Sequence, residues 1–341
     1  RRRAQGFARG ARRLWARPQV GQHRCDSSAL CRRCCGSFAT ESLAGEASVP
    51  QPLRAWVETL PAELTEVVSI VESVGSGHRV WVVGGALRDV LSGAVPNDID
   101  LCTTLTPEQM LAAFPDSQDT GAEFGTVTIE HKGLRMECTT LRSDSDSYTD
   151  GRRPDSVEFG TSLHQDLSRR DFTVNAMALD TRRVLLYDPF GGVADCEAGV
   201  LRAIGDASAR LQQDALRVMR AYRYLGAVPA GSSPRLPDAA LEGALQGSGG
   251  LVAQLSRERV LGEMQRILRT PMMAAVVKRM LLDGVLEVVL AGKGPKEVDS
   301  TELRALESLC SNQLVVDALA SEGDCAPCAG EPKPGPLDAV N

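Results

Sequence analysis

The strongest constraint on this chain is an apolar run that ends in two glycines and is followed, after an arginine, by two aspartates one residue apart. Residues 80–83 are uniformly apolar and predict a buried strand that breaks at Gly84-Gly85. Glycines at such a break let backbone N–H groups approach a phosphate at the start of the next helix. Asp98 and Asp100 alternate with apolar neighbours, so we expect a strand that directs both carboxylates to one face.

Two carboxylates on one face are suited to a divalent metal. Nucleotidyl transfer uses two such ions about 3.5 to 4 Å apart, held where two or three carboxylates converge. We therefore predict that Asp98 and Asp100 are catalytic and bind divalent metal. Glu137, between Met136 and Cys138 on a following strand, is the candidate third catalytic carboxylate, although a solvent-facing strand acid explains it equally well.

Arg88 lies in the first predicted helical turn after the glycines. From there its guanidinium can fork onto a phosphate or a ribose, or it can form an ion pair with Asp89 or Asp98. The Gly-Gly turn lacks the third glycine of a dinucleotide fingerprint, and no Gly-x4-Gly-Lys-Ser/Thr sequence is present. Neither Rossmann nor P-loop nucleotide binding is indicated.

A second cluster of charged residues begins at Asp214. Arg217 follows three residues later on a predicted helix, so the two are neighbours, and Arg220 and Arg223 continue the stripe. Where a carboxylate lies beside a guanidinium, the carboxylate can accept from the exocyclic amine of a base while the guanidinium donates to its ring nitrogen. Cytosine and adenine match that pattern, and uracil and guanine present its reverse. The alternative is an exposed helix with ordinary ion pairs.

The order of the expected elements is mixed α and β. Helical spacing covers residues 53–74, and Thr106-Pro107-Glu108 predicts the start of a short helix. Strands are expected at 126–130 and 134–141, and helices dominate from residue 201 onward. We predict an α+β fold with a head domain at 53–200, a helical neck and start of a body at 201–291, and an irregular tail at 292–341.

The N-terminal 40 residues contain ten arginines, no lysine and one acid, Asp26. This composition is typical of an organelle transit segment, so we expect residues 1–45 to be disordered and to direct the protein to a mitochondrial or plastid matrix, with the cytoplasm as a second location. The alternative is a basic arm that binds RNA. Without residues 1–40 the chain has 28 basic and 43 acidic residues, so a nucleic-acid partner requires a local basic face.

The remaining features of the composition further restrict the classes of protein to which the chain can belong. No apolar run approaches the roughly 18 to 20 residues of a membrane span, so no membrane partner is expected. Ten cysteines are scattered without a disulfide framework, which is typical of a reducing compartment. Cys31-x-x-Cys34-Cys35 and Cys325-x-x-Cys328 resemble halves of zinc sites, but no matching pair or histidine cluster lies nearby in the sequence, so we expect free thiols.

Six motifs between about residues 55 and 270 occur in the order seen in class II tRNA nucleotidyltransferases, and the chain resembles the CCA-adding enzymes and poly(A) polymerases of that family. The motifs are Gly84-Gly85-Ala86-Leu87-Arg88-Asp89, Asp98-Ile99-Asp100, Asp150-Gly151-Arg152-Arg153-Pro154, the segment 169–178, Asp188-Pro189-Phe190-Gly191-Gly192 and Asp214-Ala215-Leu216-Arg217. The resemblance implies a polymerase-β-like nucleotidyltransferase head with a mixed sheet, followed by a helical neck and a truncated body.

The resemblance also implies roles for individual residues. Gly85 and Arg88 would contact the incoming nucleotide, Asp98 and Asp100 would bind magnesium, and Arg170 would meet the triphosphate. The residues that would select CTP and then ATP are Asp214, Arg217, Arg220 and Arg223. The loop flanked by residues 150–154 would help the change from C to A, and residues 255–260 resemble the neck motif that supports the selecting helix.

The expected activity is template-independent addition of C, C and A to the 3′ end of tRNA from CTP and ATP. The enzymatic alternatives are a bacterial-type poly(A) polymerase and an enzyme that adds only CC or only A. An alternative of another class is a catalytically impaired RNA-binding protein derived from the enzyme. Two departures from the family pattern are Gln213, where Glu is usual, and a short C-terminal part after about residue 290.

Overall fold

The computed structural model describes residues 46–75, 77–144 and 157–291. The expected transit segment, both Cys-x-x-Cys sequences, the motif at 150–154 and the expected tail lie outside the described residues. Among the described residues, no helix combines the length and the hydrophobicity that crossing a bilayer requires.

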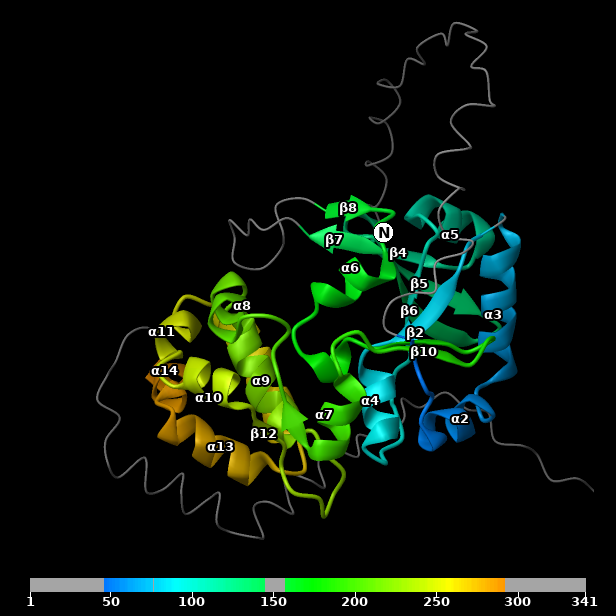
Figure 1. The fold of residues 1–341 in the computed structure, drawn as a ribbon. Helices are drawn as coiled ribbons and strands as arrows, with labels where there is room; N and C mark the ends of the chain where they lie inside the picture. The colour runs from blue at the N-terminus through cyan, green and yellow to red at the C-terminus, as the bar shows by residue number, and fades with distance from the viewer. Residues whose placement is uncertain (1–45, 76, 145–156, 292–341) are drawn as a thin grey trace, which may run out of the picture. The chain divides into compact units, whose positions relative to one another are not determined.

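An eight-stranded mixed sheet organises the N-terminal part of the described chain (Figure 1). All neighbouring strands are antiparallel except β3 and β6, which are parallel. In spatial order the strands are β1 (Glu46–Ala47), β10 (Leu185–Tyr187), β9 (Ala178–Asp180), β2 (Val80–Val83), β3 (Asp100–Thr103), β6 (Leu134–Thr140), β5 (Thr126–His131) and β4 (Gln118–Gly121). A separate ribbon pairs β7 (Arg142–Asp144) with β8 (Val157–Phe159).

Short helices cover this sheet and connect its strands. They are α2 (Gln51–Val57), α3 (Ala62–Ser73), α4 (Gly85–Leu91), α5 (Pro107–Ala113), η1 (Ala122–Phe124), α6 (Leu163–Ser168), η2 (Thr173–Asn175) and α7 (Gly192–Ala198). The single helix expected over 53–74 is wrong: Pro61 is the N-cap of α3, and the first helix ends before it because proline disfavours helical backbone at the residue preceding it.

Two local predictions are confirmed. The Thr106 hydroxyl and the Gln109 side chain form a reciprocal capping box at the start of α5. The strands expected at 126–130 and 134–141 form the hairpin of β5 and β6, joined by the turn at Lys132-Gly133. The two-to-four-residue strands β1, β4, β9 and β10 gave no sequence pattern long enough to predict them.

The C-terminal part of the described chain is helical, as expected, with one exception. Its helices are α8 (Ala207–Gln213), α9 (Leu216–Gly226), α10 (Ala239–Leu245), α11 (Gly249–Val252), α12 (Arg257–Leu268), α13 (Met273–Leu282) and α14 (Val285–Ala291). Helix α9 packs against α8, α11, α12 and α13. The exception is β12 (Leu236–Pro237), which pairs with β11 (Val200–Leu201), so the neck is not entirely helical.

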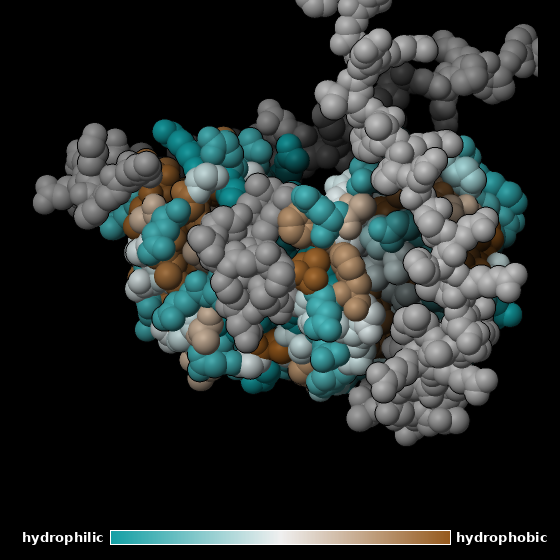
Figure 2. Space-filling view, turned by 90° about the horizontal axis from the view of Figure 1, so that it is seen from above, coloured by the Kyte–Doolittle hydropathy of each residue, from teal (hydrophilic) through white to brown (hydrophobic). Residues whose placement is uncertain are grey.

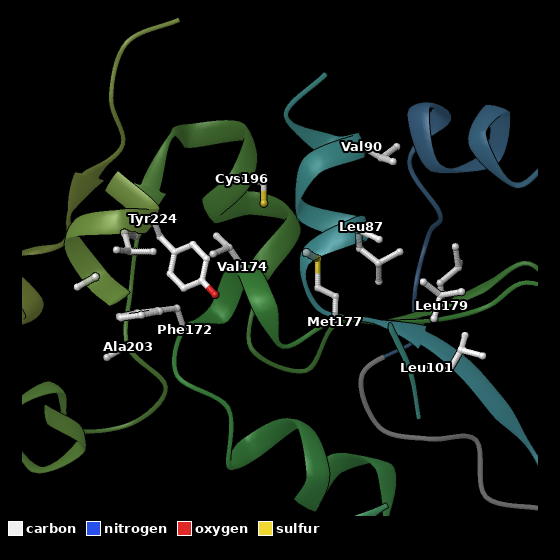
Figure 3. Close-up of a cluster of buried hydrophobic side chains, with 14 of the residues drawn as sticks. Leu87, Val90, Leu101, Phe172, Val174, Met177, Leu179, Cys196, Ala203 and Tyr224 are labelled. Carbon is white, nitrogen blue, oxygen red and sulfur yellow. The ribbon is translucent and has the colours of Figure 1, made fainter. Parts of the chain in front are cut away.

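Buried side chains from the sheet, its helices and the neck form one continuous apolar cluster. Figure 3 shows where the two parts meet: Tyr224 of α9 lies edge-on to Phe172, with ring centroids 5.7 Å apart. A second cluster on the other face of the sheet includes Trp81 and Cys102, so β2 is buried on both faces. On the face seen in Figure 2, hydrophobic residues form separate patches among hydrophilic ones.

Candidate active site

A cavity of about 460 Å³ opens where the ends of β2, β3 and β6 face helix α9. Its polar surface comes from the strand ends, from the turn after α6 and from the start of α9. The lining residues include Gly84, Gly85, Asp100, Glu137, Arg170, Asp171, Asp214, Arg217, Arg220 and Tyr224. The structure therefore brings together seven of the ten residues predicted from the sequence as site residues. Arg88, Asp98 and Arg223, which are also described, do not line this cavity.

Asp100 and Glu137 lie side by side on adjacent parallel strands. The register pairs Leu101 with Cys138, which sets Asp100 beside Glu137 one residue earlier. Both carboxylates are exposed to the cavity, while Leu101 and Cys138 point into the core. The predicted alternation along the strand is confirmed, except that β3 starts at Asp100 and Asp98 precedes it.

The environment of Asp100 is strongly acidic. Partial burial raises the pKa of Asp100, the negative charges of Glu137 and Asp98 raise it further, and Arg170 partly opposes them. A carboxylate whose pKa is raised by burial and by neighbouring negative charges is suited to a cation that neutralises it. Within the described residues, however, no three His, Cys, Asp or Glu side chains are arranged closely enough to form a complete metal cage.

This donor set fits Mg²⁺ better than a metal that needs a closed protein cage. Magnesium is usually held by one or two carboxylates and completes its octahedron with water and substrate phosphates. Asp100 and Glu137 supply two carboxylates at the cavity wall, with Asp98 close enough to influence the pKa of Asp100.

Gly84 is the residue of the Gly-Gly turn whose backbone and surroundings favour glycine. Gly84 has φ of +73°, and a Cβ there would lie 3.2 Å from Nη1 of Arg170. A Cβ on Gly85 would lie 3.4 Å from Nη2 of Arg88. The missing side chain of Gly84 therefore makes room for the Arg170 guanidinium beside the backbone that lines the cavity, whereas a Cβ on Gly85 would make only an ordinary contact with Arg88.

Arg170 is held in place from behind. Its Nη2 lies 3.2 Å from Oδ2 of Asp166, and Arg169 reaches the other oxygen of the same carboxylate at 2.8 Å. Burial alone would raise the pKa of Asp166, but the two arginines lower it, so this carboxylate stays charged. The pair of arginines is thus fixed by one buried acid at the wall of the cavity.

Arg88 makes protein contacts beneath the cavity. It forms an ion pair with Asp89 at 2.7 Å, donates from Nη1 to Oδ1 of Asn175 at 2.7 Å, and lies 4.8 Å from the centre of the Tyr224 ring. Of the two sequence-based interpretations, the structure shows the ion pair with Asp89. Arg88 contacts the residues that shape the cavity rather than lining it.

Asp214 lies in the break between α8 and α9, not on a helix as predicted. Its backbone is extended, with φ of −139°, and its Oδ1 accepts a hydrogen bond from the N–H of Leu216 at 3.1 Å. Aspartate favours such positions because its side chain can replace a missing backbone acceptor. Arg259 of α12 contacts the same oxygen at 3.3 Å, which gives the expected neck motif at 255–260 a direct link to Asp214.

Arg217 is buried at the cavity wall. Its Nη1 donates to the carbonyl of Arg210 at 3.0 Å and to Oε1 of Gln213 at 2.8 Å, and its Nη2 donates to the carbonyl of Arg169 at 3.4 Å. Gln213 also accepts from Nη1 of Arg210 at 2.6 Å. These bonds orient the Arg217 guanidinium with respect to both α8 and the turn that carries Arg169 and Arg170.

Arg220 connects the neck to the head. Its Nη2 lies 2.6 Å from Oδ2 of Asp171, and it also donates to the Tyr224 hydroxyl at 3.1 Å. Although burial opposes ionisation, Arg220 and the hydrogen bonds from Asn175 and the N–H of Phe172 lower the pKa of Asp171 to about 2. Arg220 and Asp171 therefore form a charged pair across the junction.

Arg223 is directed toward α12. Its Nε lies 2.8 Å from Oε2 of the buried Glu263, and its guanidinium lies 4.3 Å from the centre of the Tyr224 ring. The stripe predicted from the helical spacing is thus divided, because successive residues three apart rotate around the helix axis. Arg217 and Arg220 face the cavity, and Arg223 stabilises the packing of α9 on α12.

Several cavity residues had no assigned role from the sequence: Asp171, Asn175, Tyr224, Thr126, Thr139 and Arg142. Asp171 and Asn175 lie inside the motif at 169–178, and their side chains form a hydrogen bond. Their spacing of four residues is the signal in the sequence that could have indicated this contact. The motif at 188–192 has a structural explanation, since the Asp188 carboxylate accepts from the N–H groups of Gly192 and Val193 at 2.6 and 2.9 Å.

This geometry agrees with comparisons against known proteins. The family model described as "Poly A polymerase head domain" matches residues 80–202, which contain Gly84, Asp100, Glu137 and Arg170. Residues 80–202 are thus similar to poly(A) polymerase head domains. The strands and turns that carry the carboxylates and Arg170 all lie within these residues.

Proteins similar to this chain include the CCA-adding enzyme of Geobacillus stearothermophilus, which is 38% identical over 233 residues, or 68% of this chain and 56% of the relative. The CCA-adding enzyme of Streptococcus sanguinis is 35% identical over 70% of this chain and 59% of its own length. The chain therefore spans little more than half the length of the curated relatives it matches.

A solved structure supports the same fold. The crystal structure of the Bacillus stearothermophilus CCA-adding enzyme in complex with CTP is 32% identical, has a TM-score of 0.61, and matches 73% of this chain and 58% of that chain. The Thermotoga maritima CCA-adding enzyme complexed with tRNA has a TM-score of 0.57 at 23% identity and shows likeness of fold alone. The predicted α+β architecture, with a polymerase-type head followed by a largely helical neck, is confirmed.

Proposed function

We propose that this chain adds C, C and A to the 3′ end of tRNA from CTP and ATP without a nucleic-acid template. One observation carries the proposal: a single cavity contains both an acidic pair, Asp100 and Glu137, and a base-reading pair, Asp214 and Arg217. The relatives named CCA-adding enzymes, one of them solved with CTP, support this assignment.

In the proposed reaction the 3′ oxygen of the RNA forms a bond to the α-phosphorus of the nucleotide. The bond from that phosphorus to the bridging oxygen breaks, pyrophosphate leaves, and the hydroxyl proton passes to water. Asp98, Asp100 and Glu137 would hold Mg²⁺, which when bound neutralises the triphosphate and acidifies the attacking hydroxyl. Partial burial and the negative charges of Glu137 and Asp98 raise the pKa of Asp100, and a bound cation would offset these effects, which supports this role.

The turn at Gly84-Gly85 and Arg170 bind the triphosphate in this proposal. The turn exposes its backbone because neither residue has a side chain, and Arg170 lies against Gly84. Asp166 holds Arg170 in position before a nucleotide arrives, so the guanidinium does not have to be ordered during binding.

Asp214 and Arg217 select the base. The carboxylate of Asp214 accepts from the exocyclic amine of cytosine or adenine, and Arg217 donates to the neighbouring ring nitrogen. Uracil and guanine present a carbonyl and an N–H at these positions. The carboxylate would then face the carbonyl and the guanidinium would face the N–H, so neither side chain would form its hydrogen bond. A polar site built for one pattern rejects the reversed pattern strongly because buried polar groups lose their partners.

We also propose that the protein acts in a mitochondrial or plastid matrix, with the cytoplasm as a second location. The arginine-rich, acid-poor composition of residues 1–40 supports this location. A fluorescent protein fused behind residues 1–45 is expected to accumulate in one of these organelles. A diffuse signal throughout the cell would contradict the proposal.

Primer extension tests the function. The full chain is incubated with Mg²⁺, all four nucleoside triphosphates and a tRNA transcript that ends just before CCA. We expect three added residues, C, C and A, and then arrest. Long A tails would indicate a poly(A) polymerase, two added residues a CC-adding enzyme, and a product that appears only on transcripts already ending in CC an A-adding enzyme. Binding of tRNA without any incorporation would indicate an impaired derivative.

A further inference from the structure

Arg235, which directly precedes β12, is a buried cation outside the candidate active site. Only 3% of its surface is exposed, and it does not line the cavity. Within the described residues its guanidinium donates to two backbone carbonyls and one hydroxyl and is paired with no carboxylate. A buried charge without a counter-ion opposes folding, which sets Arg235 apart from Arg170 and Arg220 with their buried acidic partners.

The hydrogen bonds of Arg235 join two helices. Its Nη1 donates to the carbonyl of Tyr224 at 3.1 Å and to that of Ala227, the C-cap of α9, at 2.5 Å. Its Nη2 donates to Oγ of Ser92, the C-cap of α4, at 2.7 Å. The last carbonyls of a helix lack partners within it and carry partial negative charge, so a guanidinium suits them. Arg235 thus connects the last turn of α9 to the end of α4.

The opposite ends of the same two helices lie at the cavity. Helix α4 begins at Gly85, directly after Gly84, and α9 begins at Leu216 with Arg217 in its first turn; all four residues line the cavity. The helices are only 7 and 11 residues long, so each moves as a rigid rod. A change at their joined ends therefore changes the separation of the ends that line the cavity.

A second connection between the helices lies closer to the cavity. Arg88 of α4 lies 4.8 Å from the centre of the Tyr224 ring. Arg88 also donates to Asn175, which donates to Asp171, the partner of Arg220. With one connection near the cavity and another at the far ends, both the position and the direction of α9 relative to α4 are fixed.

A nucleoside triphosphate requires this fixed geometry because it binds at the starts of both helices. In the proposed function the triphosphate lies at Gly84-Gly85, where α4 begins, and the base meets Asp214 and Arg217, where α9 begins. A ligand with two halves gains affinity from both only when the distance between their binding sites matches the ligand.

We propose that Arg235 is a positioning residue for base selection, which holds α9 at the distance from α4 at which the base and the triphosphate of one nucleotide bind together. The proposal rests on the proposed function and extends it to a residue outside the cavity. It also accounts for a buried guanidinium without a counter-ion, because the hydrogen bonds of this guanidinium bridge α4 and α9.

Four variants of the full chain test this role. Arg235→Met removes the charge and the hydrogen bonds, Arg235→Lys keeps the charge, and Ser92→Ala removes the acceptor on α4 but leaves the two acceptors on α9. The control is Val71→Ala, which truncates a fully buried side chain of α3, a helix that packs on α5 and β2. Affinities for CTP, UTP and inorganic tripolyphosphate are measured by calorimetry with Mg²⁺. Thermal unfolding of each variant confirms that it is folded.

We expect Arg235→Met to weaken CTP binding about tenfold and to leave the affinities for UTP and tripolyphosphate unchanged. CTP uses both helices, whereas UTP lacks the matching base contacts and tripolyphosphate reaches only the turn before α4. Arg235→Lys should recover part of the CTP affinity, and Ser92→Ala should weaken CTP binding less than Arg235→Met does. Val71→Ala should lower the unfolding midpoint without changing the three affinities.

Unchanged CTP affinity in Arg235→Met would overturn the proposal. An equal loss of affinity for CTP and tripolyphosphate would overturn it as well, because the effect would then lie at the triphosphate turn alone. If Arg235→Met cannot be produced in a folded form, Ser92→Ala decides through the same three affinities. A wild-type chain that binds CTP no more tightly than UTP would instead contradict the proposed function, so the two failures are distinguishable.

Discussion

Arg217 donates a hydrogen bond to the amide oxygen of Gln213 at 2.8 Å, and Arg210 donates to the same oxygen at 2.6 Å. Arg210 in turn donates to the carbonyls of Arg169 and Arg170. Gln213 therefore links the residue proposed to read the base with the turn proposed to hold the triphosphate. The amide performs this bridging without neutralising either guanidinium.

Loss of the bridge formed by Gln213 should affect the selection of the base more than the rate of nucleotide transfer. We expect Gln213→Ala to lower the ratio of kcat/KM for CTP over UTP several-fold, because Arg217 loses one of its anchors. Gln213→Glu should preserve selection, since a carboxylate accepts the same two bonds. The control is Gln246→Ala, an exposed residue after α10. A CTP to UTP ratio in Gln213→Ala equal to that of the control would contradict this role.

Removal of either carboxylate before or at the start of β3 should stop the chemistry and leave the fold intact. We expect Asp98→Ala and Asp100→Ala each to lower the incorporation rate at least about a hundredfold, because charge neutralisation by a metal supplies several kcal/mol. Both residues are exposed, so the thermal unfolding midpoint should change little. Asp116→Ala, an exposed acid outside the cavity, is the matched control. Normal turnover in Asp98→Ala would refute the metal assignment for that residue.

Gly84 and Gly133 allow backbone strain to be separated from site geometry. Both have positive φ, +73° and +84°, but a Cβ on Gly133 would meet nothing within 4 Å, whereas one on Gly84 would approach Arg170. We expect alanine at either position to lower the free energy of unfolding by about 1–2 kcal/mol. Only Gly84→Ala should also raise the KM for CTP, and equal KM values in the two variants would argue against a triphosphate site at this turn.

The pair of Asp171 and Arg220 predicts a dependence of stability on pH. The pKa of Asp171 falls from its ordinary value of 3.8 to about 2 in the folded protein. Because the folded pKa is the lower one, the stabilisation is fully present above about pH 5 and is lost as the pH falls through 3.8 toward 2. The difference in free energy of unfolding between the wild type and Asp171→Asn, measured with urea, should therefore shrink as the pH falls across this range. A constant difference between pH 6 and pH 3 would contradict the pairing.

The sequence predicted the parts of the site that depend on local pattern. Alternation of acidic and apolar residues predicted the face on which Asp100 lies, and the glycines predicted the turn before α4. The Arg220–Asp171 pair could not be predicted because it joins segments that only tertiary packing brings together. The helical position expected for Asp214 was wrong for a local reason, since aspartate competes for backbone N–H groups and ends the helix.

Arg88 and Arg223 do not line the cavity, although the sequence predicted both as nucleotide-binding residues. The cause is again tertiary packing. Each stands at the spacing expected of a nucleotide ligand, yet each is directed to a partner from another element, Asn175 for Arg88 and Glu263 for Arg223. Tyr224 contacts both guanidinium groups. Helical spacing identifies the side of a helix on which a residue lies, but it does not identify the segment packed against that side.

Selection of the base by the protein itself is the central claim, and the double variant Asp214→Ala with Arg217→Ala tests it most directly. The measurement is the sequence of the 3′ end after extension of a tRNA that lacks CCA, with all four nucleoside triphosphates present. The account predicts that the double variant still transfers nucleotides but incorporates U and G, whereas the wild type adds only C, C and A. Strict addition of C, C and A by the double variant would contradict it.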